Sequence, residues 1–349
     1  MDMGVVFGQM LVLLAMMLVG YLVYKKGWLD DTSGGRLSKL VVNVFNPILV
    51  INGVLGQSSQ DGGNKVLQNL GFVLFYFVLI ILVSILLPFI LRAGRYRKSL
   101  YQGMSVFGNL GFMGIPVIKS IFGDKVIIYV AFYILIYNLL IYTYGVFLAR
   151  RAGKEWAAGQ RATGGESIAV AGALMGAVDG TIATVGEKNE TEKSEHGFFR
   201  RMINPGVVAA LIAVLLFVTG LSVPEPVSTF CDYMGNTTIP LSMILNGVSV
   251  AQADLKAVFG EWRMYAFVLL RMIVLPIAVC LLLQRLLRPG VLVDSVVFGV
   301  FIIELAMPIG SMIGMLMREE KAEADFCMRA VVLTTLASIV TIPVVCAFL

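Results

Sequence analysis

Long apolar runs separated by short polar or charged stretches dominate the hydropathy pattern of this chain. Each run crosses a bilayer as a helix or nearly does, because a helix rises about 1.5 Å per residue through a hydrocarbon core of roughly 30 Å. The pattern predicts an all-α polytopic membrane protein with ten transmembrane helices. The predicted spans are residues 5–24, 40–55, 70–91, 100–122, 126–148, 205–221, 234–251, 265–283, 291–317 and 326–349.

Prolines and glycines interrupt the fourth and ninth of these spans. Pro116 lies inside the fourth span behind several glycines, and Pro308 lies near the middle of the ninth. A proline lacks the amide N–H and clashes with the preceding turn, so a helix kinks or breaks there. In lipid the freed backbone groups must find other partners or line a wet cavity, and the positive N-terminal end of the half-helix after each break suits an anion. An ordinary proline kink is the alternative for either break alone.

Short motifs of the first half of the chain return in the second half after about 190 residues. The matching pairs are Asn43-x-x-x-Pro47 with Asn236-x-x-x-Pro240, Asn52-Gly53-Val54 with Asn246-Gly247-Val248, Pro88 with Pro276, and Pro116 with Pro308. Five spans per half is an odd number, so the second half would enter the membrane upside down. Inverted repeats with one broken span each are typical of secondary transporters. We expect one repeat over 1–149, a linker over 150–201 and the inverted repeat over 202–349.

The distribution of basic residues predicts the orientation of these spans. Most of the 27 Lys and Arg residues lie in the loops after the odd-numbered spans, and the positive-inside rule places those loops in the cytoplasm. Both termini are then extracytoplasmic, and the linker, either disordered or a surface helix around 168–185, is cytoplasmic. The composition is 58% hydrophobic and 14% charged, which indicates a multi-pass protein of the cell membrane. Because the charge surplus is topological, we expect no nucleic-acid partner.

Polar residues near the two breaks are candidates for substrate binding. Asn109 lies two helical turns before Pro116, so its amide would face the break and donate to a carboxylate without bringing charge into lipid. Ser311 begins the half-helix after the second break, where its hydroxyl and free backbone amides suit an oxyanion. Asn46 and Asn246 are expected to line the opposite side of the cavity. Helix–helix hydrogen bonding or small-residue packing is the alternative for each.

Three charged residues fall within or beside the predicted spans. Glu304 lies at the midpoint of the ninth span, where a carboxylate costs roughly 2.5 kcal/mol or more unless it is paired, protonated or hydrated. We therefore interpret Glu304 as a candidate carrier of a coupling proton or sodium ion. A structural ion pair with Arg271 or Lys119 is the alternative. Those two residues are in turn candidate charge partners for an anionic substrate.

A carrier for small organic anions is the function that these patterns favour. A passive channel or uniporter is the first alternative, and saturable, slow flux would separate a carrier from it. A membrane-embedded enzyme or a sensor is less favoured, because the sequence has no His-Glu-x-x-His motif, no paired intramembrane aspartates and no Ser/His pair. We expect no enzymatic activity, no cofactor and no metal site.

Several motifs of the chain also resemble those of a known family. The segment Asn109-Leu-Gly-Phe-Met-Gly114-Ile-Pro116-Val-Ile-Lys119-Ser-Ile-Phe-Gly123 closely resembles the fourth-span motif of the auxin efflux carrier family, whose members include plant PIN-like proteins. Further similar motifs are Ala306-Met-Pro308-Ile-Gly310, Asn46-Pro47, Ile203-Asn204-Pro205 and Thr341-Ile-Pro343. The resemblance covers nearly the whole chain except residues 150–201.

This resemblance implies a fold like that of the bile acid/sodium symporters, with two inverted five-helix repeats whose broken helices four and nine cross in the membrane. It implies an elevator-type carrier in which spans three to five and eight to ten move against a scaffold. The implied partners are a small carboxylate, membrane lipid and a second copy of the chain in a homodimer. By position, Asn109 matches a substrate-site asparagine, and Pro116 and Pro308 match the crossing prolines. Two departures are an absent acidic group in span 70–91 and an unexpected charge at Glu304.

Overall fold

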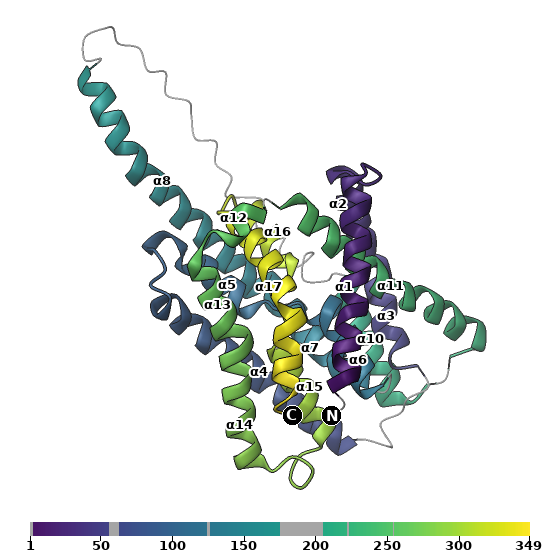
Figure 1. The fold of residues 1–349 in the computed structure, drawn as a ribbon. Coiled ribbons are helices and arrows are strands. Elements are labelled where there is room, and N and C mark those ends of the chain that lie inside the picture. The colour runs from purple at the N-terminus through teal and green to yellow at the C-terminus, as the bar shows by residue number, and fades with distance from the viewer. Residues whose placement is uncertain (1–2, 56–62, 124–125, 175–204, 222, 254) are drawn as a thin grey trace, which may run out of the picture.

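The structure is a computed structural model that describes residues 3–55, 63–123, 126–174, 205–221, 223–253 and 255–349 (Figure 1). Helices make up nearly all of this part of the chain, and its β-structure is limited to two isolated bridges. Five helices are long and apolar enough to cross a membrane, judged by length and composition. The all-α fold of a membrane protein, predicted from the hydropathy pattern, is therefore confirmed.

Every predicted span coincides with helical structure. Uninterrupted α-helices cover five of the predicted spans: α1 (Met3–Lys25), α4 (Gly63–Ile90), α10 (Pro205–Thr219), α11 (Glu225–Gln252) and α17 (Ala324–Cys346). Three more spans contain a π-helical segment: α2 (Asp31–Leu40), η1 (Val41–Phe45) and α3 (Asn46–Asn52); α7 (Ile127–Leu140), η6 (Ile141–Gly145) and α8 (Val146–Leu174); α13 (Trp262–Val268), η7 (Leu269–Val274) and α14 (Leu275–Leu287). The remaining two spans are broken: α5 (Lys98–Val106) is followed by η4 (Leu110–Gly114) and α6 (Ile115–Phe122), and α15 (Ser295–Leu305) by α16 (Ser311–Glu319). The short helices η3 (Arg95–Arg97) and α12 (Leu255–Phe259) lie in connections.

The π-helical segments explain how prolines fit inside these helices. The segments η1, η4 and η7 each end two residues before a proline, namely Pro47, Pro116 and Pro276. A proline offers no N–H to the carbonyl four residues earlier, and its ring crowds that carbonyl. Widening the turn ahead of the ring relieves the crowding while the backbone stays helical. A proline in this chain therefore widens a helix more often than it breaks one.

The break in the fourth span is a correction to the sequence-based prediction. We expected it at Pro116, but α5 ends at Val106 and the helix resumes at Leu110. Pro116 lies in the first turn of α6, where η4 has already accommodated it. The non-helical residues are Phe107, Gly108 and Asn109. In the ninth span the break lies where it was predicted, around Pro308, between the end of α15 and the start of α16.

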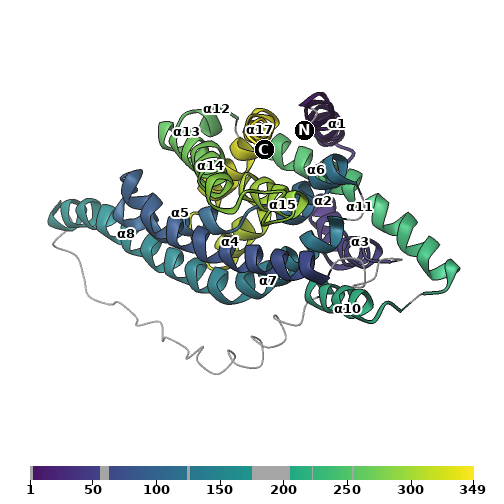
Figure 2. The ribbon, with the colours of Figure 1, turned by 90° about the horizontal axis from the view of Figure 1, so that it is seen from below.

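Two groups of helices lie on opposite sides of the molecule. Figures 1 and 2 show α1, α2, α3, α10 and α11 on one side, and α4, α5, α8, α12, α13 and α14 on the other. In the first group α1 packs along α11, and α3 packs against α10 and α11. In the second group α4 contacts α5 and α15, and α5 contacts α8. The other parts of the broken spans, α6, α15 and α16, lie between the two groups, where α6 contacts α1 and α15 contacts α17.

The contact between α1 and α11 depends on two glycines. A Cβ atom added to Gly20 would lie 2.0 Å from the Ile244 carbonyl oxygen, and one added to Gly247 would lie 1.8 Å from the Met17 carbonyl oxygen. Without side chains at these positions, the two backbones approach until they touch. In a membrane, apolar helices gain no hydrophobic energy by packing on each other, because the lipid is apolar too. Small residues stabilise helix pairs there by allowing close van der Waals packing.

The linker predicted over residues 150–201 begins as a helix. The fifth span does not end at residue 148, because α8 continues to Leu174. Glu155 connects the first turns of α8 beyond the span to the start of α5. Its carboxylate accepts hydrogen bonds from the backbone N–H (3.0 Å) and the hydroxyl (2.8 Å) of Ser99. Residues 175–204 lie outside the described part of the chain. The choice between a disordered linker and a surface helix over 168–185 therefore stays a prediction beyond Leu174.

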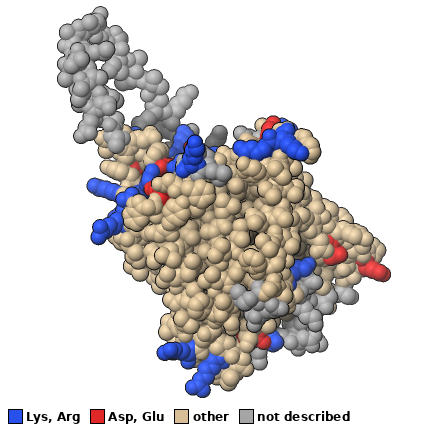
Figure 3. All heavy atoms as spheres, in the orientation of Figure 1, with Lys and Arg blue, Asp and Glu red and all other residues tan. Residues whose placement is uncertain are grey.

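Charged side chains concentrate toward the ends of the molecule. Figure 3 shows most Lys and Arg side chains gathered toward the upper and lower ends, with a broad, largely uncharged face between them. Ion pairs at these ends join helices that are distant in sequence. They are Lys65 with Asp294 (2.8 Å), Arg97 with Glu323 (2.6 Å), Arg97 with Glu261 (3.3 Å) and Arg150 with Glu320 (3.4 Å).

Candidate functional site

The two helix breaks meet and pair with each other. Gly108 and Ile309 form an isolated antiparallel bridge. The Asn109 N–H donates to the Pro308 carbonyl at 2.7 Å, and the Gly310 N–H donates to the Phe107 carbonyl at 2.9 Å. Each extended break would otherwise leave backbone groups unpaired in an apolar surrounding, which costs several kcal/mol per group. At the crossing, backbone groups that have no partner within their own span therefore form hydrogen bonds with the other span.

Two helix N-termini begin at this crossing. Asn109 is the N-cap of the helix that runs through η4 and α6, and its side-chain oxygen accepts from the Phe112 N–H at 3.2 Å. Gly310 is the N-cap of α16, which starts at Ser311. The Ile309 N–H is satisfied by the Thr334 hydroxyl of α17 at 3.2 Å. The partial positive charges of both half-helices therefore point toward the crossing from the side on which the helices resume.

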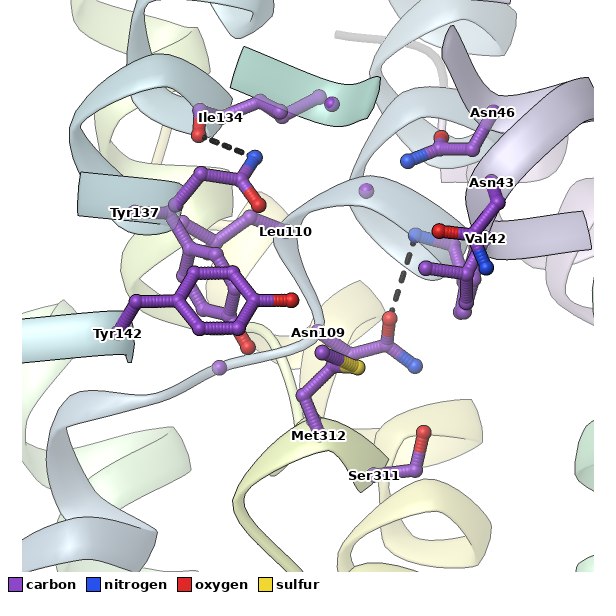
Figure 4. Close-up of a pocket in the computed structure, with 16 residues that line it drawn as sticks. Val42, Asn43, Asn46, Asn109, Leu110, Ile134, Tyr137, Tyr142, Ser311 and Met312 are labelled. Carbon is purple, nitrogen blue, oxygen red and sulfur yellow. Dashed lines mark hydrogen bonds between the residues drawn. The ribbon is translucent and has the colours of Figure 1, made fainter. Parts of the chain in front are cut away.

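A cavity lies on this side of the crossing (Figure 4). It encloses an empty volume of about 680 Å³, part of which is open to the surroundings. Its lining is Val42, Asn43, Asn46, Gly108, Asn109, Leu110, Gly111, Phe112, Ile134, Tyr137, Asn138, Tyr142, Gly206, Gly310, Ser311 and Met312. Among these described lining residues none carries a charge, and the polar groups are amides, hydroxyls and backbone. In Figure 4, Asn109 lies between Ser311 and Met312 of α16 and the asparagines of the second span.

Three of the predicted substrate residues line this cavity. They are Asn46, Asn109 and Ser311, from the second, fourth and ninth spans. Asn109 is there for a reason other than the one we expected, because it lies at the break itself and not two turns before it. The Asn46 side-chain oxygen is buried and has no hydrogen-bond partner within the described residues, so it retains its capacity to accept.

The remaining predicted substrate residues lie elsewhere. Pro116 is buried in α6, about one turn beyond Phe112 of the cavity lining. Pro308 is part of the crossing, but it faces a small pocket on the opposite side together with Arg271. Asn246 is buried in α11 and is not among the lining residues. These three residues therefore do not line the cavity, and a role for them in substrate binding stays a prediction.

Sequence reasoning missed several polar lining residues. Asn43 lines the cavity beside Asn46, although its sequence pattern marks it only as part of a repeated motif. Asn138 also lines the cavity, and its amide nitrogen donates to the Ile134 carbonyl at 2.9 Å. A lone asparagine in the otherwise apolar and aromatic stretch of α7 was an available signal, since polar residues in a span usually face its interior. Tyr137 and Tyr142 carried no such signal, because tyrosines are frequent throughout the chain.

Arg271 lies behind the crossing, on the side opposite the cavity. Its guanidinium is buried and donates from Nε to the Ser105 carbonyl at 2.9 Å and from Nη1 to the Leu305 carbonyl. Ser105 lies at the C-terminal end of α5 and Leu305 at the C-terminal end of α15. One cation thus bonds the negative ends of both half-helices that enter the crossing. The crossing has a positive side at the cavity and a negative side neutralised by Arg271.

Glu304 lies next to Gly114, and its predicted charge partners do not reach it. Within the described residues neither Glu304 carboxyl oxygen has a hydrogen-bond partner, and no ion pair joins it to Arg271. Lys119 points to α11, where it donates to the Asn236 side-chain oxygen at 3.4 Å. The alternative of a structural ion pair for Glu304 is therefore wrong in this structure.

Comparison with known proteins bears on the whole chain. The model of a family described as "Membrane transport protein" matches residues 5–346. No curated protein matches the sequence significantly. The match spans both broken helices, the cavity and the crossing.

Proposed function

Because the chain belongs to the auxin efflux carrier/PIN-like family of membrane transport proteins, we propose that it is a secondary active carrier of small organic anions across the cytoplasmic membrane. The observation that carries this proposal is the cavity at the crossing, where the N-termini of two half-helices converge among uncharged polar side chains. This family is one of transporters and not of enzymes.

The chemistry of the cavity favours a carboxylate. Backbone N–H groups at helix N-termini and side-chain amides donate hydrogen bonds, and the helix dipoles add partial positive charge. No Asp or Glu is among the described lining residues, so no fixed negative charge opposes an anion there. Apolar and aromatic residues such as Leu110, Ile134 and Tyr137 supply the surface for the organic part of the substrate.

We extend the proposal to the mechanism. All ten spans would cross the membrane as two inverted five-helix repeats, with both termini outside the cytoplasm and with a homodimer as the assembly. A scaffold of α1–α3, α10 and α11 would stay in place while the remaining helices, the transport unit, slide past it with the bound substrate. The ion pairs Lys65–Asp294, Arg97–Glu323 and Arg150–Glu320 support a rigid transport unit, because each joins first-half and second-half helices of that unit.

Uptake into liposomes tests the proposal. Purified protein is reconstituted, and uptake of a panel of labelled mono- and dicarboxylates, including an aromatic acid, is compared with uptake into protein-free vesicles. We expect saturable uptake of at least one acid and accelerated exchange when the same acid is loaded inside. Such counterflow is a property of a carrier and not of a passive channel, so flux without saturation or counterflow would favour the channel. Absence of any protein-dependent flux across the panel would count against an organic-anion carrier.

A further inference from the structure

Glu304 is an unpartnered acid in the last turn of α15, just before the crossing. Its side chain is fully buried, and neither carboxyl oxygen has a hydrogen-bond partner within the described residues. A Cβ atom added to Gly114 would lie 2.8 Å and 2.9 Å from the two carboxyl oxygens. The carboxyl therefore packs directly on the backbone of η4, in a space that only a glycine leaves open. Gly111, one turn earlier in η4, lines the substrate cavity.

The charged and titratable groups around Glu304 do not neutralise it. Arg271 of η7 donates to the Ser105 and Leu305 carbonyls, and no ion pair joins it to Glu304. Tyr76 of α4 and Tyr133 of α7 interact with it electrostatically, and their rings contact each other with centroids 5.5 Å apart. Both are phenols, which bring no positive charge.

An ionised carboxylate in this position would be buried without a counter-charge, which is among the most costly arrangements in a protein interior. Two devices remove that cost: a bound metal cation or a bound proton. A metal cation needs several oxygen ligands at once, and the described residues contain no cluster of three or more Asp, Glu, His or Cys side chains, so backbone, amide or hydroxyl oxygens would have to supply the other ligands. A proton needs no further ligand. A proton is therefore the simpler way to neutralise Glu304.

We propose that Glu304 is a proton-binding site that couples proton movement to anion transport. The inference rests on the proposed carrier function. Glu304 and Gly114 belong to the two broken helices that also form the substrate cavity, so proton and substrate bind to the same unit. Because Glu304 is not among the lining residues, both sites can be occupied together and cross in the same direction. The crossing closes around Glu304 only when the acid is neutral, and the proton exchanges with water when the Glu304–Gly114 contact opens. The carrier is thus a proton–anion symporter.

Infrared spectroscopy tests the site without any transport assay. Purified wild-type protein, Glu304→Gln and the matched control Glu225→Gln, an exposed glutamate at the start of α11, are compared across a pH titration. We expect a protonated-carboxyl C=O band that persists at neutral pH in the wild type and in E225Q and disappears in E304Q. A wild-type spectrum without such a band at neutral pH would overturn the proposal even if E304Q does not fold.

Transport in liposomes tests the coupling. An inward gradient of one pH unit supports up to about tenfold accumulation for one proton per substrate. We expect this accumulation with the wild type and E225Q and no accumulation with E304Q. E304D retains an acid, so we expect it to accumulate substrate with an altered pH dependence. E304Q should retain measurable counterflow at equal pH. If the wild type shows counterflow but no response to the pH gradient, the protein is an anion carrier and the proposed proton site is wrong. If a sodium gradient stimulates the wild type and not E304Q, the coupling ion at Glu304 is sodium and not a proton.

Discussion

At the scale of single residues, two side chains hold the crossing together from opposite sides. Asn109 caps the half-helix on the cavity side, and Arg271 bonds the ends of the two half-helices on the other side. Both residues were candidates from sequence because polar groups are costly in a membrane span. What each one contacts was not deducible, since both partners of Arg271 are backbone carbonyls from remote segments.

Substitutions of Asn109 separate its two roles. Asn109→Asp retains a side-chain oxygen for the Phe112 N–H but removes the amide donor and puts a negative charge in the cavity. We expect N109D to keep the wild-type melting temperature within a few degrees and to weaken carboxylate binding at least about tenfold, which is 1.4 kcal/mol. Asn109→Ala also loses the cap, at a cost of about 0.5–2 kcal/mol, so it should both melt earlier and bind less. Unchanged affinity in N109D would remove Asn109 from the substrate site.

Substitutions of Arg271 test its role in the crossing. Arg271→Met leaves the Ser105 and Leu305 carbonyls without this donor, and a buried unsatisfied group costs about 1–3 kcal/mol. Arg271→Lys provides one compact charge in place of a two-pronged guanidinium. We expect melting temperatures in detergent in the order wild type, R271K, R271M. The exposed Arg285→Lys in α14 is the control and should melt like the wild type; an equal loss in R285K would indicate a general effect of charge.

At the scale of elements, helix continuity and helix contact follow different rules in this chain. The prolines in α3, α6 and α14 follow π-helical turns and leave their helices continuous. The true breaks occur at 107–109 and 306–310, where the two extended segments bond each other. Glycine, and not proline, determines how closely α1 and α11 approach, through Gly20 and Gly247.

A glycine substitution tests the contact between α1 and α11. The added methyl of Gly247→Ala would overlap the Met17 carbonyl oxygen, so the helices must move apart. Overpacking of this kind costs about 1–3 kcal/mol. We expect a lower melting temperature for G247A. Gly8→Ala in α1 is the matched control, because nothing lies within 4 Å of its added Cβ and alanine favours a helix by up to about 1 kcal/mol. A G247A protein as stable as G8A would contradict the close contact.

At the scale of the whole molecule, the long-range ion pairs and the broken helices belong to the proposed transport unit. Lys65–Asp294 and Arg97–Glu323 each connect the first-half and second-half helices of the transport unit. The hydrogen bond from Lys119 to Asn236 instead connects α6 of that unit to α11 of the proposed scaffold. An elevator mechanism requires contacts of the first kind to persist during transport and contacts of the second kind to break.

Thiol cross-linking tests this difference. A cysteine pair at Lys119 and Asn236 joins the scaffold to the transport unit, and a pair at Lys65 and Asp294 lies within the transport unit. The four native cysteines are buried and free, so they give little background reaction. We expect a short bifunctional thiol reagent to abolish counterflow in the variant with the first cysteine pair and to leave most of the counterflow in the variant with the second pair. Full transport by the variant cross-linked between positions 119 and 236 would exclude sliding of the transport unit at this interface.

Sequence alone determined the class of the molecule, the positions of its helices, its family and the break at Pro308. These properties follow from local hydrophobicity, from proline stereochemistry and from short motifs, each of which depends only on residues within a few helical turns of one another. Tertiary structure alone decided that the first break lies at 107–109, that Arg271 bonds two helix ends, that Glu304 packs on Gly114, and that Asn43 and Asn138 join the cavity. The reason is that a backbone amide or a buried side chain is satisfied by whichever group packing brings within about 3 Å, and that group is distant in sequence.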